Sequence, residues 1–320
     1  MKNKLRNFVS IFVPILLGAG LTYYTYTTFT EQQLAQMKAY FINANYNYVA
    51  ISLFFAFSGY ALRAYRWQYT LEHVGVKSNF KLNFLAVSVG YFINMSIPRS
   101  GEVSRALILK KYQDAPFDKV FGTIIAERIV DFIILLLFIF ASLIVEFKTL
   151  KEFLLAYIPV NKLLILLIVG IIMCLVSLYF YYYSTWKLIL AIKQKVEGLK
   201  EGALSVLNLP NKIPFLIQTL MIWISYVLMF YFATFALKET SGITFGAVLL
   251  AFIIGSLTIA FTNGGFGFFP ILIAKILFLY QIPLEAGNAF GWIVWTSQLL
   301  ITVVLGVLAF LVLPMMSRKK

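Results

Sequence analysis

The chain has 320 residues, of which 61% are hydrophobic and 12% are charged, and its mean hydropathy is +0.86. Soluble globular proteins carry about 25% charged residues, so this composition excludes a soluble protein and predicts an all-α, polytopic integral membrane protein. The formal net charge is +14, but most lysines and arginines fall in segments that we predict to be cytoplasmic, as the positive-inside rule requires. We therefore expect anionic lipids of the inner leaflet as partners of these segments, and no nucleic acid.

Histidine and cysteine are nearly absent from the chain, which has one cysteine, Cys174, and one histidine, His73. An intramolecular disulfide needs two cysteines. Zinc sites and catalytic pairs built on histidine or cysteine also need more of these residues than the chain supplies. We therefore expect no metal, no cofactor and no catalytic residue.

The first two predicted spans are residues 8–28 and 47–66. Basic residues precede the first span, so it runs outward from a cytoplasmic N-terminus, and a loop at 29–46 lies outside. Arg63 and Arg66 stand at the inner end of the second span, where such residues are typical of interface anchors. We therefore expect both arginines among the lipid headgroups.

The third apolar segment, 82–97, is too short to cross the membrane. Its length is about 16 residues or ~24 Å, whereas the hydrocarbon core measures about 30 Å, and Pro98 disfavours helix at the residue before it. A full crossing would also place the following basic run outside. We therefore predict a re-entrant hairpin over 82–112, which enters along 82–97, turns at Pro98–Gly101 and returns along 102–112.

The next span, 119–145, carries charges inside the membrane. Its uncharged part after Asp131 is roughly 14 residues or ~21 Å long, so the helix must reach back through Asp131 and Glu127 to span the bilayer. Charged side chains at this depth are costly and normally face a bundle interior or a wet cavity. With the hairpin, this span places six charged residues in the membrane: Arg99, Glu102, Arg105, Glu127, Arg128 and Asp131.

These six charges balance, because three are arginines and three are carboxylates. Arg99 and Glu102, Glu102 and Arg105, and Arg128 and Asp131 are each three residues apart, a spacing at which opposite charges on a helix pair. One interpretation is a functional site in a groove. The other is a self-neutralising network that only sets the helix register, and the sequence leaves both open.

The second half of the chain repeats this order with the opposite orientation. We predict spans at 161–183, 213–236 and 289–313, and an interfacial amphipathic helix at 186–209. Two short apolar segments, 244–261 and 271–280, flank T-N-G-G-F-G-F-F-P. They predict a second hairpin over 244–281, although two crossings would satisfy the same topology.

The chain is thus predicted to form a single membrane domain, 1–320, with about six full spans and two re-entrant hairpins in an inverted repeat. The halves are 1–145 and 161–320, and both termini are cytoplasmic. Broken segments at corresponding places of inverted halves mark the central site of a transporter. Arginines and helix ends there can bind phosphate, and the carboxylates can bind a cationic headgroup. The expected substrate-binding residues are the six charged residues with Asn94, Asn263, Gly264, Gly265 and Gly267.

Three motifs in the chain resemble a known family. The motifs are R-A-Y-R-W, G-Y-F-I-N-M-S-I-P-R-S-G-E-V-S-R-A and A-E-R-I-V-D, and they are similar to those of the flippase-like family typified by the transmembrane region of lysylphosphatidylglycerol synthase. Asn263 stands where that family tends to have proline. Because the chain stops at Lys320, just after its last span, we expect the soluble aminoacyl-transferase domain of the full-length synthases to be absent. The resemblance implies that these are motif residues: Asn94, Pro98, Arg99, Gly101, Glu102, Arg105, Glu127, Arg128 and Asp131.

The charged groove and the resemblance together predict a lipid flippase-like transporter of the cytoplasmic membrane, which moves a phospholipid or a lipid-linked headgroup. The alternatives are a membrane-embedded enzyme acting on lipid-linked sugars or phospholipids, and a non-transporting partner subunit of envelope synthesis. Each of the three carboxylates among the six charged residues has an arginine close by in sequence, which argues against a catalytic acid with a tuned pKa. A homo-oligomer is compatible with the sequence.

Overall fold

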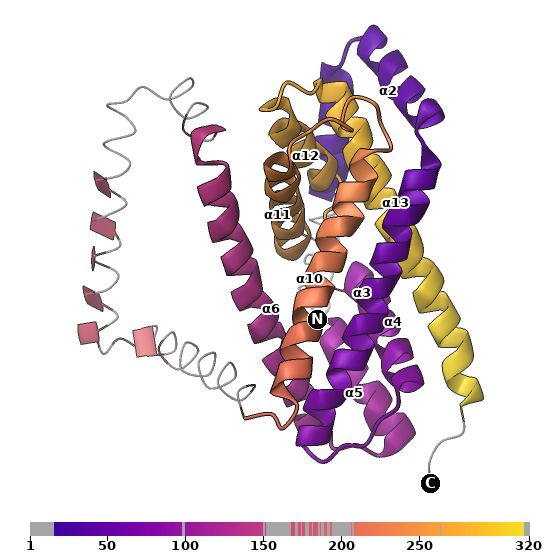
Figure 1. The fold of residues 1–320 in the computed structure, drawn as a ribbon, viewed down its shortest axis with the longest axis vertical. Helices are drawn as coiled ribbons and strands as arrows, with labels where there is room; N and C mark the ends of the chain where they lie inside the picture. The colour runs from indigo at the N-terminus through magenta and orange to yellow at the C-terminus, as the bar shows by residue number, and fades with distance from the viewer. Residues whose placement is uncertain are drawn as a thin grey trace, which may run out of the picture.

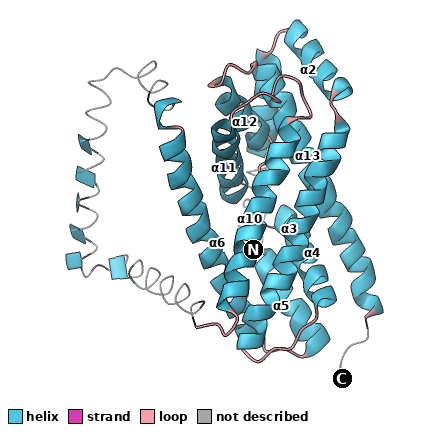
Figure 2. Cartoon of the chain, in the orientation of Figure 1, coloured by secondary structure: helices cyan, strands magenta, loops and turns pink. Residues whose placement is uncertain are grey.

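The computed structural model describes residues 16–97, 100–149, 151, 206, 208–262 and 264–316, together with scattered positions between 168 and 193. Within these residues the regular structure is helical, and none lies in a β-strand (Figure 2). Helices long and apolar enough to cross a membrane are α6 (Phe117–Val145), α10 (Lys212–Thr234) and α13 (Leu284–Val312). The predicted all-α membrane fold class is therefore confirmed. The predicted segments 161–183 and 186–209 lie almost wholly outside the described residues.

Residues 16–28 form a first helical stretch. A second helix follows it. α2 (Glu31–Asn43) begins with a capping box, in which the Thr30 hydroxyl accepts a hydrogen bond from the Gln33 backbone N–H and the Gln33 side chain accepts one from the Thr30 N–H. The helix packs against α13. The segment 29–46, predicted as a loop, therefore contains a helix, because this cap satisfies free N–H groups with which a helix starts. Its place outside the membrane stays a prediction.

α3 (Tyr46–His73) packs along α10 and joins the two halves of the chain. The Asn45 backbone N–H donates to the Ala236 carbonyl at 2.8 Å, and the Ser52 hydroxyl donates to the Met229 carbonyl at 2.7 Å. Rising residue numbers on α3 meet falling ones on α10, so the two helices are antiparallel (Figure 1).

α4 (Phe80–Ser96) and α5 (Ser100–Gln113) pack against each other in the lower part of Figure 1. The Asn79 side chain caps α4 by accepting a hydrogen bond from the Leu82 N–H at 2.8 Å. Gly101 approaches α4 so closely that an added Cβ would overlap the Gly90 carbonyl oxygen. This helix pair corresponds to the hairpin predicted over 82–112, and its tip, Pro98 and Arg99, lies outside the described residues.

A second pair, α11 (Phe245–Phe261) and α12 (Phe268–Phe278), lies in the upper part of Figure 1. α12 has 11 residues, or about 16 Å of helix, which is about half the thickness of a bilayer core. This length favours the hairpin over two crossings.

The helices of the two halves pack in matching pairs. α3 lies against α10, α4 lies against α13, and α11 lies against α6. If each helix is replaced by its counterpart in the other half, the contact of α4 with α13 becomes the contact of α11 with α6, and the contact of α3 with α10 is unchanged. The predicted inverted order requires this correspondence. The inverted repeat, the re-entry of the hairpins and the halves 1–145 and 161–320 stay predictions, since the described residues leave out most of 150–205.

Buried apolar side chains form two main groups, one for each end of the bundle. The upper group includes Phe230, Phe252, Phe269 and Phe290, and Phe230 meets Phe290 edge to face with ring centroids 5.4 Å apart. The lower group, around α3, α4, α5 and the start of α6, includes Trp67, Leu71, Leu109 and Ile124. Those charged residues predicted from the sequence that the structure describes lie beside this lower group.

Glu146, directly after the last residue of α6, is buried. The Tyr280 hydroxyl, in the turn after α12, donates to the Glu146 carboxylate at 2.7 Å. Burial and the Glu146 carboxylate raise the pKa of Tyr280 above its ordinary value, so the phenol stays protonated and keeps donating. This contact ties the C-terminal end of α6 to the second helix pair.

Candidate functional site

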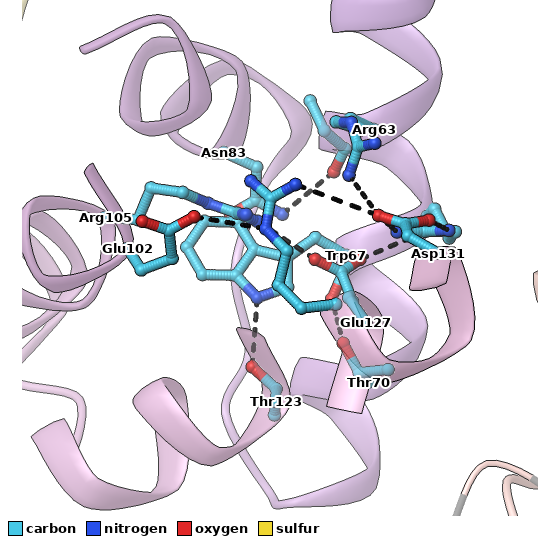
Figure 3. Close-up of polar contacts among 12 residues, drawn as sticks. Arg63, Trp67, Thr70, Asn83, Glu102, Arg105, Thr123, Glu127 and Asp131 are labelled. Atoms are coloured by element: carbon cyan, nitrogen blue, oxygen red, sulfur yellow. Dashed lines mark hydrogen bonds and ion pairs between the residues drawn. The ribbon is translucent and has the colours of Figure 1, made fainter. Parts of the chain in front are cut away.

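The centre of the site is Asp131 of α6, which lies between two arginines of α3, and Figure 3 labels Asp131 and one of them, Arg63. Arg63 Nη1 donates to Asp131 Oδ2 at 2.7 Å, and Arg66 Nη1 donates to Asp131 Oδ1 at 2.8 Å. Arg66 is fully buried and Arg63 is nearly so. The two arginines are three residues apart, so they point from the same face of α3 towards α6.

The prediction that Arg63 and Arg66 anchor to lipid headgroups is wrong. α3 continues to His73, so Arg66 lies inside the helix and not at its end. One signal in the sequence could have found these residues. Arg63 and Arg66 are one helical turn apart, as are Glu127 and Asp131, and matched spacings of opposite charge on two apolar helices favour pairing between them.

Glu127, one turn before Asp131, connects α3 with α5. Its carboxylate accepts hydrogen bonds from Arg66 Nε and from Arg105 Nη2, each at 3.2 Å. The Arg105 guanidinium lies 4.0 Å from the ring centroid of Trp67, and the Trp67 indole donates to the Thr123 hydroxyl at 3.0 Å. The hairpin helix α5 and the helix α6 therefore face each other, held by buried charges and an aromatic ring.

Arg128 and Glu102 form a more exposed pair at the edge. Arg128 Nε lies 3.1 Å from Glu102 Oε1, and their side chains are 35% and 18% exposed. The Asn94 amide donates to the other Glu102 oxygen at 3.4 Å, while its own oxygen accepts from the Gly101 N–H at 2.7 Å. Asn94 thus links the two helices of the first pair and holds Glu102.

We refer to Arg63, Arg66, Arg105, Arg128, Glu102, Glu127 and Asp131 as the arginine–carboxylate cluster. Its described members are four guanidiniums and three carboxylates, so it carries an excess of positive charge. The balance predicted from the sequence is wrong, because the two arginines of α3 belong to the cluster. The predicted pairing of Arg105 with Glu102 is replaced by pairs between helices. Arg99 lies outside the described residues.

Two tyrosines extend the cluster towards the second half of the chain. Arg63 Nε donates to the Tyr226 hydroxyl of α10 at 2.8 Å, and the Tyr91 hydroxyl of α4 lies 3.4 Å from that of Tyr226. Arg66 reaches the same helix, where Nη1 donates to the Thr219 hydroxyl at 3.0 Å. The charged site is therefore bonded across the contact between α3 and α10.

Replacing Tyr226 with phenylalanine should lower the stability of the purified protein by about 1.5–3 kcal/mol, the range for a hydrogen bond to a charged group. The change leaves Arg63 Nε without its acceptor. Thermal unfolding of Tyr226→Phe would be compared with that of Tyr231→Phe. Tyr231 lies on the same helix, and its hydroxyl makes no hydrogen bond with the described residues. Equal melting temperatures for the two variants would show that the Tyr226 contact adds nothing.

The glycines predicted for the second hairpin form a turn away from the charges. Gly264, Gly265 and Gly267 have φ of +69°, +80° and +73°, in the left-handed region that glycine adopts readily. The Trp295 indole donates to the Gly264 carbonyl at 2.8 Å. In the described part of the chain no hydrogen bond or ion pair joins this turn to the arginine–carboxylate cluster, and Asn263 lies outside the described residues.

Comparison with known proteins places the chain in a family. Residues 11–306 match the family described as the lysylphosphatidylglycerol synthase TM region. The chain belongs to this family. The part matched to the lysylphosphatidylglycerol synthase TM region contains every member of the cluster and both short helix pairs, so the site is built from residues that the family match covers.

A UPF0104 membrane protein of Methanocaldococcus jannaschii is 32% identical to the chain over 124 residues. This stretch is 37% of the chain and 37% of the relative, so the similarity covers well under half of either protein. No solved structure matches the chain. These matches and the apolar helices identify a multi-pass membrane protein of the lysylphosphatidylglycerol synthase TM family.

Proposed function

We propose that this protein is a flippase-like transporter of the cytoplasmic membrane, which moves a phospholipid or a lipid-linked headgroup between leaflets. The observation that carries the proposal is a charged network that is buried on three helices but ends in a half-exposed guanidinium, Arg128. A polar headgroup needs such a wet, charged path to pass the hydrocarbon. Membership of the family supports this proposal.

The cluster lies at membrane depth in this proposal. α6 must extend inward past Asp131 and Glu127 to span about 30 Å of hydrocarbon, since the uncharged run after Asp131 gives only ~21 Å. Charges at this depth normally pair with one another or line a substrate path. Both short helix pairs then enter the membrane from opposite sides, with both termini in the cytoplasm.

Transport would use the packing between the two halves. The antiparallel contact between α3 and α10 carries hydrogen bonds along its length, which suits a fixed axis. The short helix pairs, which reach only part of the way across, are the elements suited to open one side and then the other. Arg128 and Glu102, at the tip side of the first pair, would meet the headgroup.

The contacts favour transport over the enzyme alternative. Asp131 and Glu127 each accept hydrogen bonds from two arginines, so their oxygens are already engaged by guanidiniums. A general acid or base must instead change its protonation during the reaction. These carboxylates are therefore suited to orient arginines and not to transfer protons.

The test is translocation of fluorescent lipids in liposomes that contain the purified protein. We expect wild type to speed the exchange of a lipid between leaflets. Arg128→Gln should slow it by roughly tenfold or more, because a hydrogen bond to a charged group is worth about 1.5–3 kcal/mol. Lys119→Gln, which neutralises an exposed cation of the same helix, should leave the rate unchanged.

The probes would include anionic, zwitterionic and lipid-linked sugar headgroups, at matched protein insertion. If wild type behaves as empty liposomes do for every probe, the transport proposal is wrong. The buried cluster would then be a network that supports the fold, as expected for the partner-subunit alternative.

A further inference from the structure

We infer that the arginine–carboxylate cluster selects a lipid with an anionic phosphate and no cationic group, and that Arg128 is the residue that contacts this phosphate. This inference rests on the proposed function, since it names the substrate class of the same site. It departs from the expectation that the carboxylates of the cluster receive a cationic headgroup.

The carboxylates of the cluster are already occupied. Asp131 lies between Arg63 and Arg66, and Glu127 lies between Arg66 and Arg105, at distances of 2.7–3.2 Å. A cationic headgroup could reach either carboxylate only by displacing a buried guanidinium. Such a displacement would leave a buried positive charge without its partner, which is strongly unfavourable.

Arg128 differs from the buried arginines in both exposure and bonding. Its side chain is 35% exposed, whereas that of Arg66 is fully buried and donates to Glu127, Asp131 and Thr219. Arg128 Nε lies 3.1 Å from Glu102 but lacks the alignment of a hydrogen bond, and Arg128 Nη1 lies 3.9 Å from Asp131. Arg128 Nε is itself buried, so the donors left for a ligand are those of the two Nη groups, which lie in the planar fork that binds phosphate oxygens in pairs.

Glu102 opposes the binding of an anion in this arrangement, because its carboxylate lies beside Arg128. Arg128 Nε and the Asn94 amide hold this carboxylate in place. A phosphate would bind the Nη donors of Arg128 while Glu102 stays beside Nε. Glu102 therefore stays paired, and the phosphate adds one negative charge to the cluster.

The excess of positive charge in the cluster acts in the same direction. Four guanidiniums face three carboxylates among the described residues, so one negative charge from a substrate completes the balance. A lysyl or choline group attached to that phosphate would bring a cation to a site with no free carboxylate. The same lipid with and without such a group therefore separates the two possibilities.

The test is equilibrium binding of short-chain lipids to the purified protein in detergent, measured by isothermal titration calorimetry. The probes are dihexanoyl phosphatidylglycerol, its lysyl ester, dihexanoyl phosphatidylcholine and inorganic phosphate. We expect phosphatidylglycerol to bind at least tenfold more tightly than its lysyl ester and than phosphatidylcholine. Arg128→Gln should weaken phosphatidylglycerol binding by roughly tenfold or more, and Lys119→Gln should not change it.

Glu102→Gln provides the second variant, since it removes the competing anion without removing Arg128. We expect it to bind phosphatidylglycerol several-fold more tightly than wild type does. Tighter binding of the lysyl ester, or equal loss in Arg128→Gln and Lys119→Gln, would overturn the inference. If inorganic phosphate bound as tightly as phosphatidylglycerol, the ligand of the site would be free phosphate and not a lipid.

Binding in detergent needs no transport, so the two proposals fail separately. Selective binding of phosphatidylglycerol without translocation in liposomes would contradict the transport proposal and leave this inference standing. Translocation of phosphatidylcholine and phosphatidylglycerol at equal rates, with equal affinities, would contradict the inference and leave the transport proposal standing.

Discussion

Asp131→Asn is expected to destabilise the protein by about 3–5 kcal/mol, the typical effect of removing one partner of a buried ion pair. One carboxylate serves two buried guanidiniums, with Arg63 Nη1 at 2.7 Å and Arg66 Nη1 at 2.8 Å. Asparagine keeps the shape of the side chain but removes its charge, so both arginines lose their counter-ion. Thermal unfolding of the detergent-purified protein, followed by the loss of monodisperse material, measures the effect.

Asp118→Asn is the matched control for this prediction. This substitution makes the same change, from aspartate to asparagine, on the same helix. Asp118, however, is exposed in the first turn of α6. An acidic residue there interacts favourably with the helix dipole by only about 0.3–1 kcal/mol. If both variants lost the same stability, the destabilisation would not come from the buried pairs.

A double-mutant cycle identifies the pair itself. Arg63→Gln leaves Asp131 with Arg66 alone, and Asp131→Asn takes this counter-ion from both arginines, whereas in the double variant only Arg66 loses it. We expect the double variant to lose less stability than the sum of the single losses, with a difference of about 0.5–3 kcal/mol. Strict additivity would mean that Arg63 and Asp131 do not stabilise each other.

Gly101→Ala is expected to separate the two helices of the first pair. A Cβ at this position would overlap the Gly90 carbonyl oxygen and would also lie 2.7 Å from the Asn94 amide. Backbone cannot yield as a flexible side chain does, so we expect a loss of about 1–3 kcal/mol or more, as in other overpacked sites. The Asn94 amide that holds Glu102 would move with it, so lipid translocation should also fall.

Gly122→Ala is the control for the helix propensity of the new residue. Gly122 lies inside α6, and an added Cβ there meets nothing within 4 Å. Alanine in an open helical position should stabilise the helix by up to about 1 kcal/mol. Opposite signs for the two substitutions are therefore the expected result, and a gain in both would show that α4 and α5 do not approach closely at Gly101.

Part of the site could be read from the chain because burying charge is costly at any position. The short apolar run after Asp131 predicted that Glu127 and Asp131 lie inside the membrane, which stays a prediction, and the structure buries both within the helical bundle. The break at Pro98 predicted the first helix pair. Arg63 and Arg66 were misplaced, because a basic residue near a helix end looks the same in sequence whether it faces headgroups or a buried carboxylate.

The sequence by itself determined the class of the protein, its helix breaks and most of its charged positions, since hydropathy, length and proline act on each segment separately. Only the tertiary structure decided which charges pair. Neighbours along a helix gain little from pairing, whereas Arg66, Arg105, Glu127 and Asp131 meet because α3, α5 and α6 pack together and exclude water. The positive excess of the cluster, and with it the preference for an anion, follows from that packing.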